Sequence, residues 1–80
     1  MKVRIYVTLK EGILDPQGKA VQHSLQTLGL TSVQDVRIGK YIEICLNTIP
    51  EDTVETYIRD MCQKLLANPV IEDYRYEICR

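Results

Sequence analysis

Residues 2–16 read KVRIYVTLKEGILDP, and this stretch contains a strand followed by the start of a helix. Residues 2–9 alternate between polar and apolar side chains, which is the period of a strand with one buried face. Asp15 can cap a helix with its side chain, and Pro16 suits the first helical position because that position needs no amide hydrogen. We therefore predict a strand over residues 2–9 and a helix over residues 16–28, ended by Gly29.

Residues 33–79 supply the remaining elements. The period of two returns after residue 33 but is interrupted at Ile38-Gly39-Lys40, which is typical of a tight reversal between two strands. Pro50 opens a second helical stretch, and Asn68-Pro69 ends it. The pattern predicts strands at residues 33–38, 40–47 and 71–79, with the second helix between the last two.

The order strand, helix, strand, strand, helix, strand favours an α+β, ferredoxin-like fold in one domain, residues 1–80. This fold has a four-stranded antiparallel sheet with both helices on one face. The other face would be open to water and would carry Tyr6 and Tyr41. An exposed sheet face with tyrosines is typical of a surface that associates, so we predict a homodimer or a dimer of dimers.

The composition excludes several classes of protein. A chain of 80 residues with 45% hydrophobic and 26% charged residues is one small folded domain with little room for an enzyme. The net charge of −1 argues against a nucleic-acid-binding protein, although the first forty residues carry +3 and the last forty −4. No apolar run approaches membrane-spanning length and the N-terminus does not look like a signal peptide, so we expect a cytoplasmic protein without a membrane role.

No group of residues points to catalysis or metal binding, so we expect no catalytic residue, no metal site and no cofactor bound by this chain. The only histidine, His23, lies in the middle of the first predicted helix, without a serine or cysteine whose sequence context marks a nucleophile. The acidic residues of the second helix are expected to form a solvated face: Glu51, Asp52, Glu55 and Asp60. The cysteines are widely spaced and are expected to be small buried hydrophobic residues: Cys45, Cys62 and Cys79.

Polar and glycine residues gather at one end of the predicted fold, where three connections meet. Basic side chains around a helix N-terminus can hold an anion or a carboxylate of a partner. The alternative is purely structural, with a helix cap, a glycine turn and solvated lysines. The spacing matches no phosphate-binding motif. The candidate docking residues are Lys10, Gly12, Asp15, Pro16, Gly18, Arg37, Gly39 and Lys40.

Two motifs carry a resemblance to a known family. Residues 6–20, YVTLKEGILDPQGKA, and residues 36–43, VRIGKYIE, resemble the small PurS subunits of phosphoribosylformylglycinamidine (FGAM) synthase. The resemblance implies a step of de novo purine biosynthesis, in which formylglycinamide ribonucleotide becomes FGAM with ATP and glutamine. It also implies a non-catalytic subunit that dimerises, holds the large synthetase subunit and the glutaminase subunit together, and supports ammonia transfer between them. ATP and Mg would then be used by the complex rather than by this chain.

The resemblance gives the candidate residues an expected role in docking on the large subunit. Asp15 would cap the first helix, Gly18 would allow close approach, and Arg37 with Lys40 would supply complementary charge. An alternative from another class is a free-standing ACT-like module that binds a small regulatory molecule. A platform for single-stranded nucleic acid is opposed by the acidic second half of the chain.

Overall fold

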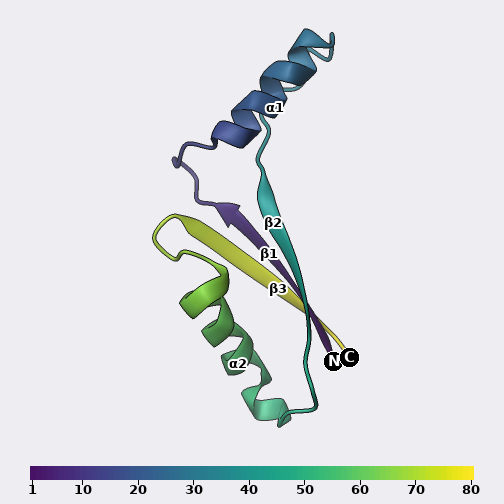
Figure 1. Ribbon diagram of the computed structural model, residues 1–80, viewed down its shortest axis with the longest axis vertical. Coiled ribbons are helices and arrows are strands. Elements are labelled where there is room, and N and C mark those ends of the chain that lie inside the picture. Colours follow the sequence, from purple (N-terminus) through teal and green to yellow (C-terminus); the bar gives the residue numbers. More distant parts are fainter.

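The computed structural model describes residues 1–80 and contains two helices and one sheet (Figure 1). Helix α2 is preceded by a 3₁₀ turn, Glu51–Thr53, and followed by a π turn, Cys62–Leu66. All strand pairs are antiparallel, and the strand order is β2-β1-β3. The elements are β1 (Lys2–Leu9), α1 (Pro16–Thr27), β2 (Gly39–Cys45), α2 (Val54–Met61) and β3 (Glu72–Cys79).

The core lies between β1 and α2. The aliphatic side chains of the central strand, Val3, Ile5 and Val7, are at most 1% exposed. They pack with buried residues of α2 and its final turn, including Val54 and Ile58. The aliphatic side of the first strand therefore faces a helix, as its alternating pattern predicts. Removal of these side chains from water stabilises the sheet.

The predicted strand over residues 33–38 and the reversal at residues 38–40 are wrong. A two-residue hairpin turn needs a positive φ, and the residues with positive φ are Gly12 and Gly29, not Gly39. Gly39 instead begins β2 opposite Thr8. Residues 33–38 run beside α1, where the side chains of Gln22 and Gln26 donate to the carbonyls of Gln34 and Val33 at 2.9 and 3.3 Å. The sheet consequently has three strands rather than four.

The prediction that both helices cover one face of the sheet is also wrong. Because the chain does not reverse at residues 38–40, α1 is carried beyond the end of the sheet, and only α2 covers the sheet (Figure 1). The molecule measures 51 × 26 × 15 Å, with a radius of gyration of 16.2 Å. A compact chain of this length would have a radius of about 12 Å. The single copy is therefore an extended molecule with a projecting arm, which we define as residues 16–38.

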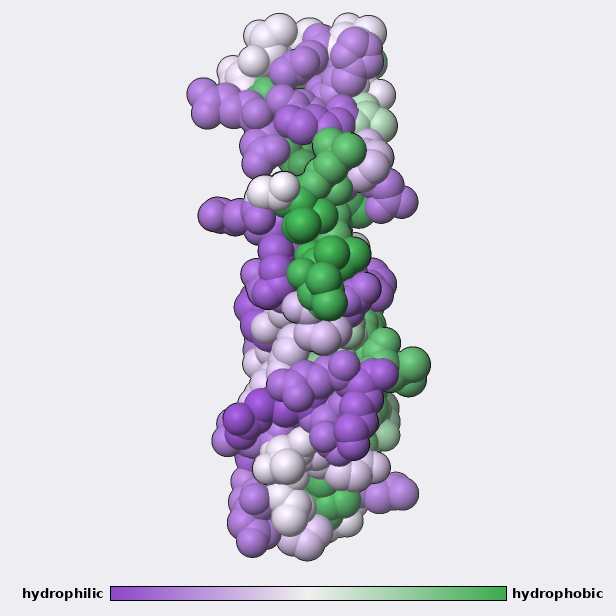
Figure 2. All heavy atoms as spheres, turned by 90° about the vertical axis from the view of Figure 1, so that its left-hand side faces the viewer, coloured by the Kyte–Doolittle hydropathy of each residue, from purple (hydrophilic) through white to green (hydrophobic).

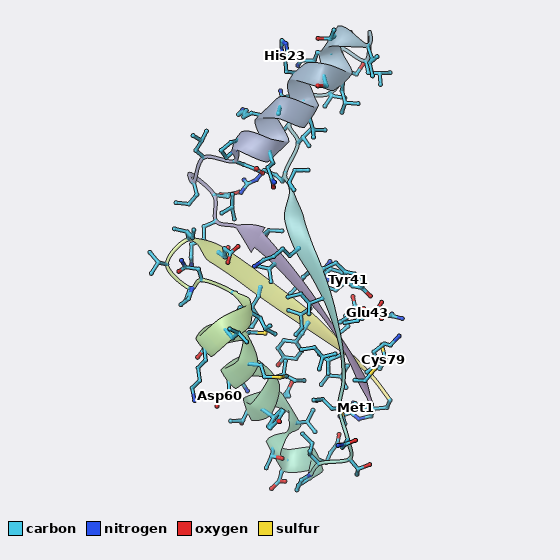
Figure 3. All side chains as sticks on the ribbon, viewed as in Figure 1. Met1, His23, Tyr41, Glu43, Asp60 and Cys79 are labelled. Atoms are coloured by element: carbon cyan, nitrogen blue, oxygen red, sulfur yellow. The ribbon has the colours of Figure 1, made fainter.

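The face of the sheet away from α2 is open, as predicted. Tyr41 and Glu43 point to this side (Figure 3), and the ring of Tyr41 lies 5.2 Å from that of Tyr6. The guanidinium of Arg75 lies 4.0 Å from the centre of the Tyr6 ring. Burial of the tyrosine hydroxyl is the main cause that raises the pKa of Tyr41, followed by its hydrogen bond to Glu43.

The cysteines do not share one environment. Cys62 is buried and its thiol pKa is raised by burial, whereas Cys45 is exposed and Cys79 is half-buried. The expectation of three buried cysteines is confirmed only for Cys62, because strand alternation places Cys45 and Cys79, which both lie opposite Lys2, on the open face. His23 and the four acidic residues of the second helical stretch are exposed, as expected. None of the helices combines the length and the apolar character that crossing a membrane requires.

Candidate functional site

Asp15 is the centre of the junction between the arm and the sheet. Its side chain is only 7% exposed. One carboxylate oxygen accepts a hydrogen bond from the amide of Gly18 at 2.9 Å, and the other accepts from the amide of Ile38 at 2.9 Å. These two backbone hydrogen bonds, in that order, lower the pKa of Asp15, and the charge of Arg37 adds to the effect. The predicted cap of the first helix is confirmed, and the same carboxylate also fixes the entry to β2.

Arg37 is tied to the end of β1. Its guanidinium donates to the carbonyl oxygens of Leu9 and Lys10 at 2.7 and 3.3 Å. Its Nε lies 3.7 Å from a carboxylate oxygen of Asp15. The guanidinium therefore donates hydrogen bonds to the carbonyl groups at the point where the chain leaves the sheet. These bonds hold the loop after β1 against residues 37–38.

Two of the predicted glycines allow backbones to approach each other closely. A Cβ atom on Gly18 would collide with the carbonyl oxygen of Val36 and with the Asp15 carboxylate. A Cβ atom on Gly39 would collide with the carbonyl oxygen of Val7. Gly18 therefore lets residues 36–38 of the same chain pack on the first turn of α1, whereas the sequence led us to expect the close approach of a docking partner at this glycine.

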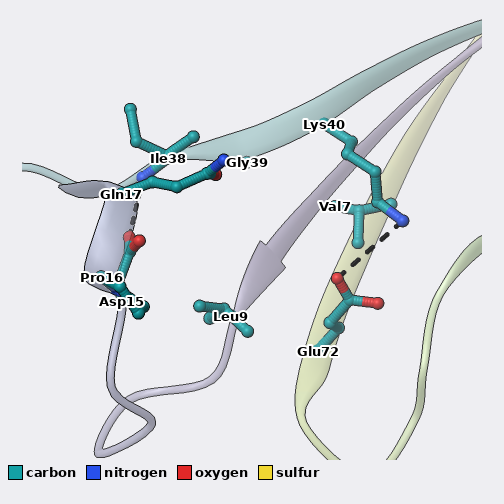
Figure 4. A pocket seen from close by; sticks show the side chains of 9 residues that line it. All are labelled: Val7, Leu9, Asp15, Pro16, Gln17, Ile38, Gly39, Lys40 and Glu72. Atoms are coloured by element: carbon teal, nitrogen blue, oxygen red, sulfur yellow. Dashed lines mark hydrogen bonds and ion pairs between the residues drawn. The ribbon is translucent and has the colours of Figure 1, made fainter.

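The same end of the sheet contains a pocket of about 390 Å³ (Figure 4). Four predicted residues line it together: Asp15, Pro16, Gly39 and Lys40. The ammonium of Lys40 lies 4.0 Å from the carboxylate of Glu72 and donates to the carbonyl of Leu66 at 3.3 Å. The charged groups that line the pocket are thus already paired with groups of this chain. This pairing favours a structural and docking role of the pocket over catalysis.

The other predicted residues lie on the outer side of this end. Lys10 forms an ion pair with Asp73 at 3.2 Å, and its amide donates to the carbonyl of Ile71 at 2.9 Å. Gly12 lies in the exposed loop after β1 with a φ of +83°, a conformation that favours glycine. The loop after β1, the start of β2 and the loop that leads into β3 meet here, although the predicted hairpin, one of the three expected connections, does not form.

The sequence interpretation missed an apolar patch at this end. Leu14 and Val70 are 72% and 77% exposed, and Ile13 and Ile71 are each 36% exposed. Figure 2 shows apolar side chains gathered along the middle of the elongated molecule on this side. Glu72, which pairs with Lys40, was missed as well. The sequence carried one signal of this patch, the apolar pair Ile13-Leu14 between Gly12 and Asp15, because a loop that only faces water rarely contains two adjacent apolar residues.

Comparisons with known proteins agree on one family. The family model described as PurS, phosphoribosylformylglycinamidine (FGAM) synthase, matches residues 2–80. The PurS subunit from Bacillus subtilis is 56% identical over 77 residues, which cover 96% of this chain and 90% of that protein. The PurS subunit from Methanocaldococcus jannaschii is 39% identical over 77 residues, which cover 96% and 93%.

Solved structures give the same result. The chain is similar to Bacillus subtilis PurS with a TM-score of 0.90 and 54% identity, covering 99% of this chain and 98% of that one. It is also similar to a chain of PurLQS from Thermotoga maritima, with a TM-score of 0.84 and 26% identity, covering 95% and 93%. The likeness extends over the arm as well as the sheet, since nearly the whole chain is covered.

Proposed function

Because this chain belongs to the PurS family of FGAM synthase subunits, which serve purine biosynthesis, we propose that it holds the large synthetase subunit and the glutaminase subunit of that ligase together. The observation that carries the proposal is the match over residues 2–80, including the junction built around Asp15. A similar chain occurs in a structure of PurLQS, an assembly of three kinds of subunit. The ACT-like alternative finds no support, because the relatives reported above are all PurS subunits.

We assign the docking surface to the eight predicted residues, which divide into two groups. The first group shapes the surface from inside through the hydrogen bonds and close approaches described above: Asp15, Gly18, Arg37 and Gly39. The second group is accessible to a partner: Lys10, Gly12, Pro16 and Lys40. The lysine charges beside the exposed Leu14 and Val70 favour a partner surface that is acidic at its rim and apolar at its centre.

The remaining parts of the proposed function concern the whole assembly. ATP and Mg would bind the large subunit, and this chain would support the transfer of ammonia by fixing the two larger subunits relative to each other. The chain would act as one domain over residues 1–80, in the cytoplasm and as a homodimer. The four-stranded ferredoxin-like arrangement would form only when a second copy is present, because one copy has a sheet of three strands.

Reconstitution tests the function directly. The large subunit, the glutaminase subunit and this chain are mixed, and glutamine-dependent FGAM formation is measured with and without the chain. We expect activity to depend on the chain, and we expect the three components to elute together in size-exclusion chromatography. Full activity in the absence of the chain would contradict the proposal.

Two matched lysine variants test the docking surface. Lys10 and Lys2 lie near opposite ends of β1, are 41% and 42% exposed, and each forms one surface ion pair, with Asp73 and Glu43. Such pairs contribute little to folding. We expect Lys10→Glu to weaken assembly with the large subunit about tenfold or more and Lys2→Glu to leave it within about twofold, because charge at a docking rim governs association. Equal effects of the two variants would place the docking surface elsewhere.

A further inference from the structure

Strand β3 leaves one edge of the sheet without a neighbouring strand. In the order β2-β1-β3 it pairs only with β1, on the side of the sheet nearer to α2 (Figure 1). It is eight residues long, Glu72–Cys79. An edge strand presents a row of backbone N–H and C=O groups to which a strand of another protein can add. The outer edge of β3 is therefore a surface on which a partner can bind.

The register identifies the backbone groups that point outward from β3. The amide of Lys10 donates to the carbonyl of Ile71 at 2.9 Å, and these residues are directly opposite when the register of β1 and β3 is continued by one residue. Hydrogen-bonded and non-hydrogen-bonded pairs alternate in an antiparallel ladder. The odd-numbered residues of β3 are therefore bonded to β1, and the even-numbered residues direct their N–H and C=O groups away from it. The amide of Glu72 already donates to the carbonyl of Asn68 at 2.7 Å. The free outward groups belong to Tyr74, Tyr76 and Ile78.

The side chains along this edge do not protect it against pairing. Edge strands that are protected in this way carry lysine, proline or a bulge, and β3 has none of these. Asp73, Arg75 and Glu77 lie on the open face of the sheet, opposite the even-numbered residues of β1, and are 65%, 69% and 49% exposed. Directly opposed residues of neighbouring strands lie on the same face. A strand with a basic, an acidic and a basic residue in the opposed positions would therefore match this edge.

A pocket of about 470 Å³ connects this edge with the docking surface. Lys10, a residue of the docking surface, lines the pocket and forms its ion pair with Asp73 there. The side-chain amide of Gln63 donates to the hydroxyl of Tyr74 at 3.4 Å. A pocket with mostly polar groups fits a long polar side chain of a segment that runs along β3. The lining residues are Lys10, Gln63, Pro69, Glu72, Asp73 and Tyr74.

We propose that an extended segment of the large synthetase subunit adds to the outer edge of β3 as an additional strand. Its backbone bonds to the free outward groups of β3, its charged residues oppose those on the open face, and one long polar side chain enters the pocket beside Lys10. The large subunit is the occupant because this edge is continuous with the docking surface through Lys10. The inference rests on the proposed function and names how the large subunit recognises this chain.

Hydrogen exchange of single amides tests the pairing. The chain exchanges in deuterium oxide alone and in the assembled complex of three components, and each amide is followed by fragmentation mass spectrometry. In the chain alone, the amides of Tyr74, Tyr76 and Ile78 should exchange at least about tenfold faster than those of Arg75 and Glu77, which are bonded to β1. In the complex, the three outward amides should slow by at least about tenfold.

The outcomes of this experiment separate the inference from the proposed function. Assembly of the three components without slower exchange of the outward amides would overturn the inference and leave the proposed function intact. Slow exchange of these amides in the chain alone would also overturn it, because another part or another copy of the chain would then already cover the edge. Failure of the components to assemble would contradict the proposed function, and the inference with it.

Two matched glutamates test the charge pattern. Glu77 of β3 and Glu43 of β2 are both directly opposite Arg4, are 49% and 45% exposed, and each form one ion pair. Glu77→Lys should weaken binding of the large subunit about tenfold, because the new lysine would lie opposite a basic residue of the added strand. Glu43→Lys, on the opposite edge of the sheet, should change the binding less than about threefold. Equal effects of the two variants would overturn the proposal.

Discussion

The two helices begin in similar ways but end in different surroundings. Pro16 opens α1 and Pro50 precedes the turn that leads into α2, and both stretches carry apolar residues at helical spacing. α2 and its final turn bury Val54, Ile58 and Cys62 against β1, whereas α1 buries only Gly18. The comparison teaches that an amphipathic pattern identifies a helix and the side that needs cover, but not which part of the molecule, or which copy, provides that cover.

The largest expected effect is in the body of the molecule. Ile58 is fully buried, so Ile58→Ala should lower the free energy of unfolding by about 2–5 kcal/mol through lost burial and a residual cavity. Leu28→Ala, measured below the concentration at which copies associate, should change it by less than about 0.5 kcal/mol. Urea unfolding of both variants measures the difference. Similar losses at high dilution would show that α1 is packed within one copy, and would break the comparison.

The junction between the two regions should be the next most sensitive place. Alanine normally improves a helix relative to glycine. At Gly18, however, a Cβ atom would collide with the carbonyl oxygen of Val36, so Gly18→Ala should destabilise by about 1–3 kcal/mol. The sign of the change in Tm decides the matter. A rise in Tm would mean that α1 and residues 36–38 can move apart without loss of stability.

Charge at the junction should give a smaller, pH-dependent effect. The pKa of Asp15 is lowered in the folded chain by the amides of Gly18 and Ile38. The stabilisation is therefore complete above the unfolded value of about 3.9, and it is lost as pH falls through the lower folded value. Asp15→Asn keeps a capping side chain but removes the charge, so its Tm should be lower by roughly 3–6 °C at pH 7.

Thermal unfolding between pH 2 and 7 measures this difference. The gap in Tm between the original chain and Asp15→Asn should be constant above about pH 5 and should shrink below about pH 4. A gap that is independent of pH over this whole range would mean that the charge of Asp15 does not hold the junction.

The smallest effect is expected on the open face of the sheet. Arg75 lies over the ring of Tyr6 and forms an ion pair with Glu77 at 3.5 Å, but it is 69% exposed. Arg75→Ala should therefore cost about 0.5–1 kcal/mol in urea unfolding. A loss as large as that of Ile58→Ala would show that this face is covered in solution. That result would mean that association with another molecule buries the open face of the sheet.

Most elements were predictable because their signals are local. Alternation over residues 2–9, the cap at Asp15 and the prolines before the helices fix β1, α1, and α2 together with its flanking turns to within a few residues of the predicted bounds. The absence of a strand over residues 33–38 was not predictable. The side chains of this segment have the right pattern, but formation of a strand depends on a neighbouring strand, and the expected neighbour required a turn at Gly39 that the chain does not make.

The candidate site was predictable in its residues more than in their roles. Asp15 caps α1 as expected, whereas Gly18, expected to admit a docking partner, makes room for residues 36–38 of the same chain. Arg37 was expected to be a free docking charge, yet its guanidinium is occupied by the carbonyls of Leu9 and Lys10. The local sequence does not indicate that these two carbonyls, which are 28 and 27 residues from Arg37 in the chain, lie beside its guanidinium. The exposed Leu14 and Val70 were overlooked because exposure itself is a tertiary property.

The sequence by itself determined where the helices and three of the four predicted strands lie, which face of each is apolar, and which family the chain resembles. Each of these depends on periodicity, capping or motif, and so on residues a few positions apart. Only the tertiary structure decided that the chain stays straight at Gly39, that three strands form in one copy, and that α1 projects away from its own sheet. The physical reason is that a hairpin and a straight chain satisfy the same local pattern. The straight course is held by long-range hydrogen bonds, in which the Asp15 carboxylate accepts from the amide of Ile38 and Arg37 donates to the carbonyl of Leu9.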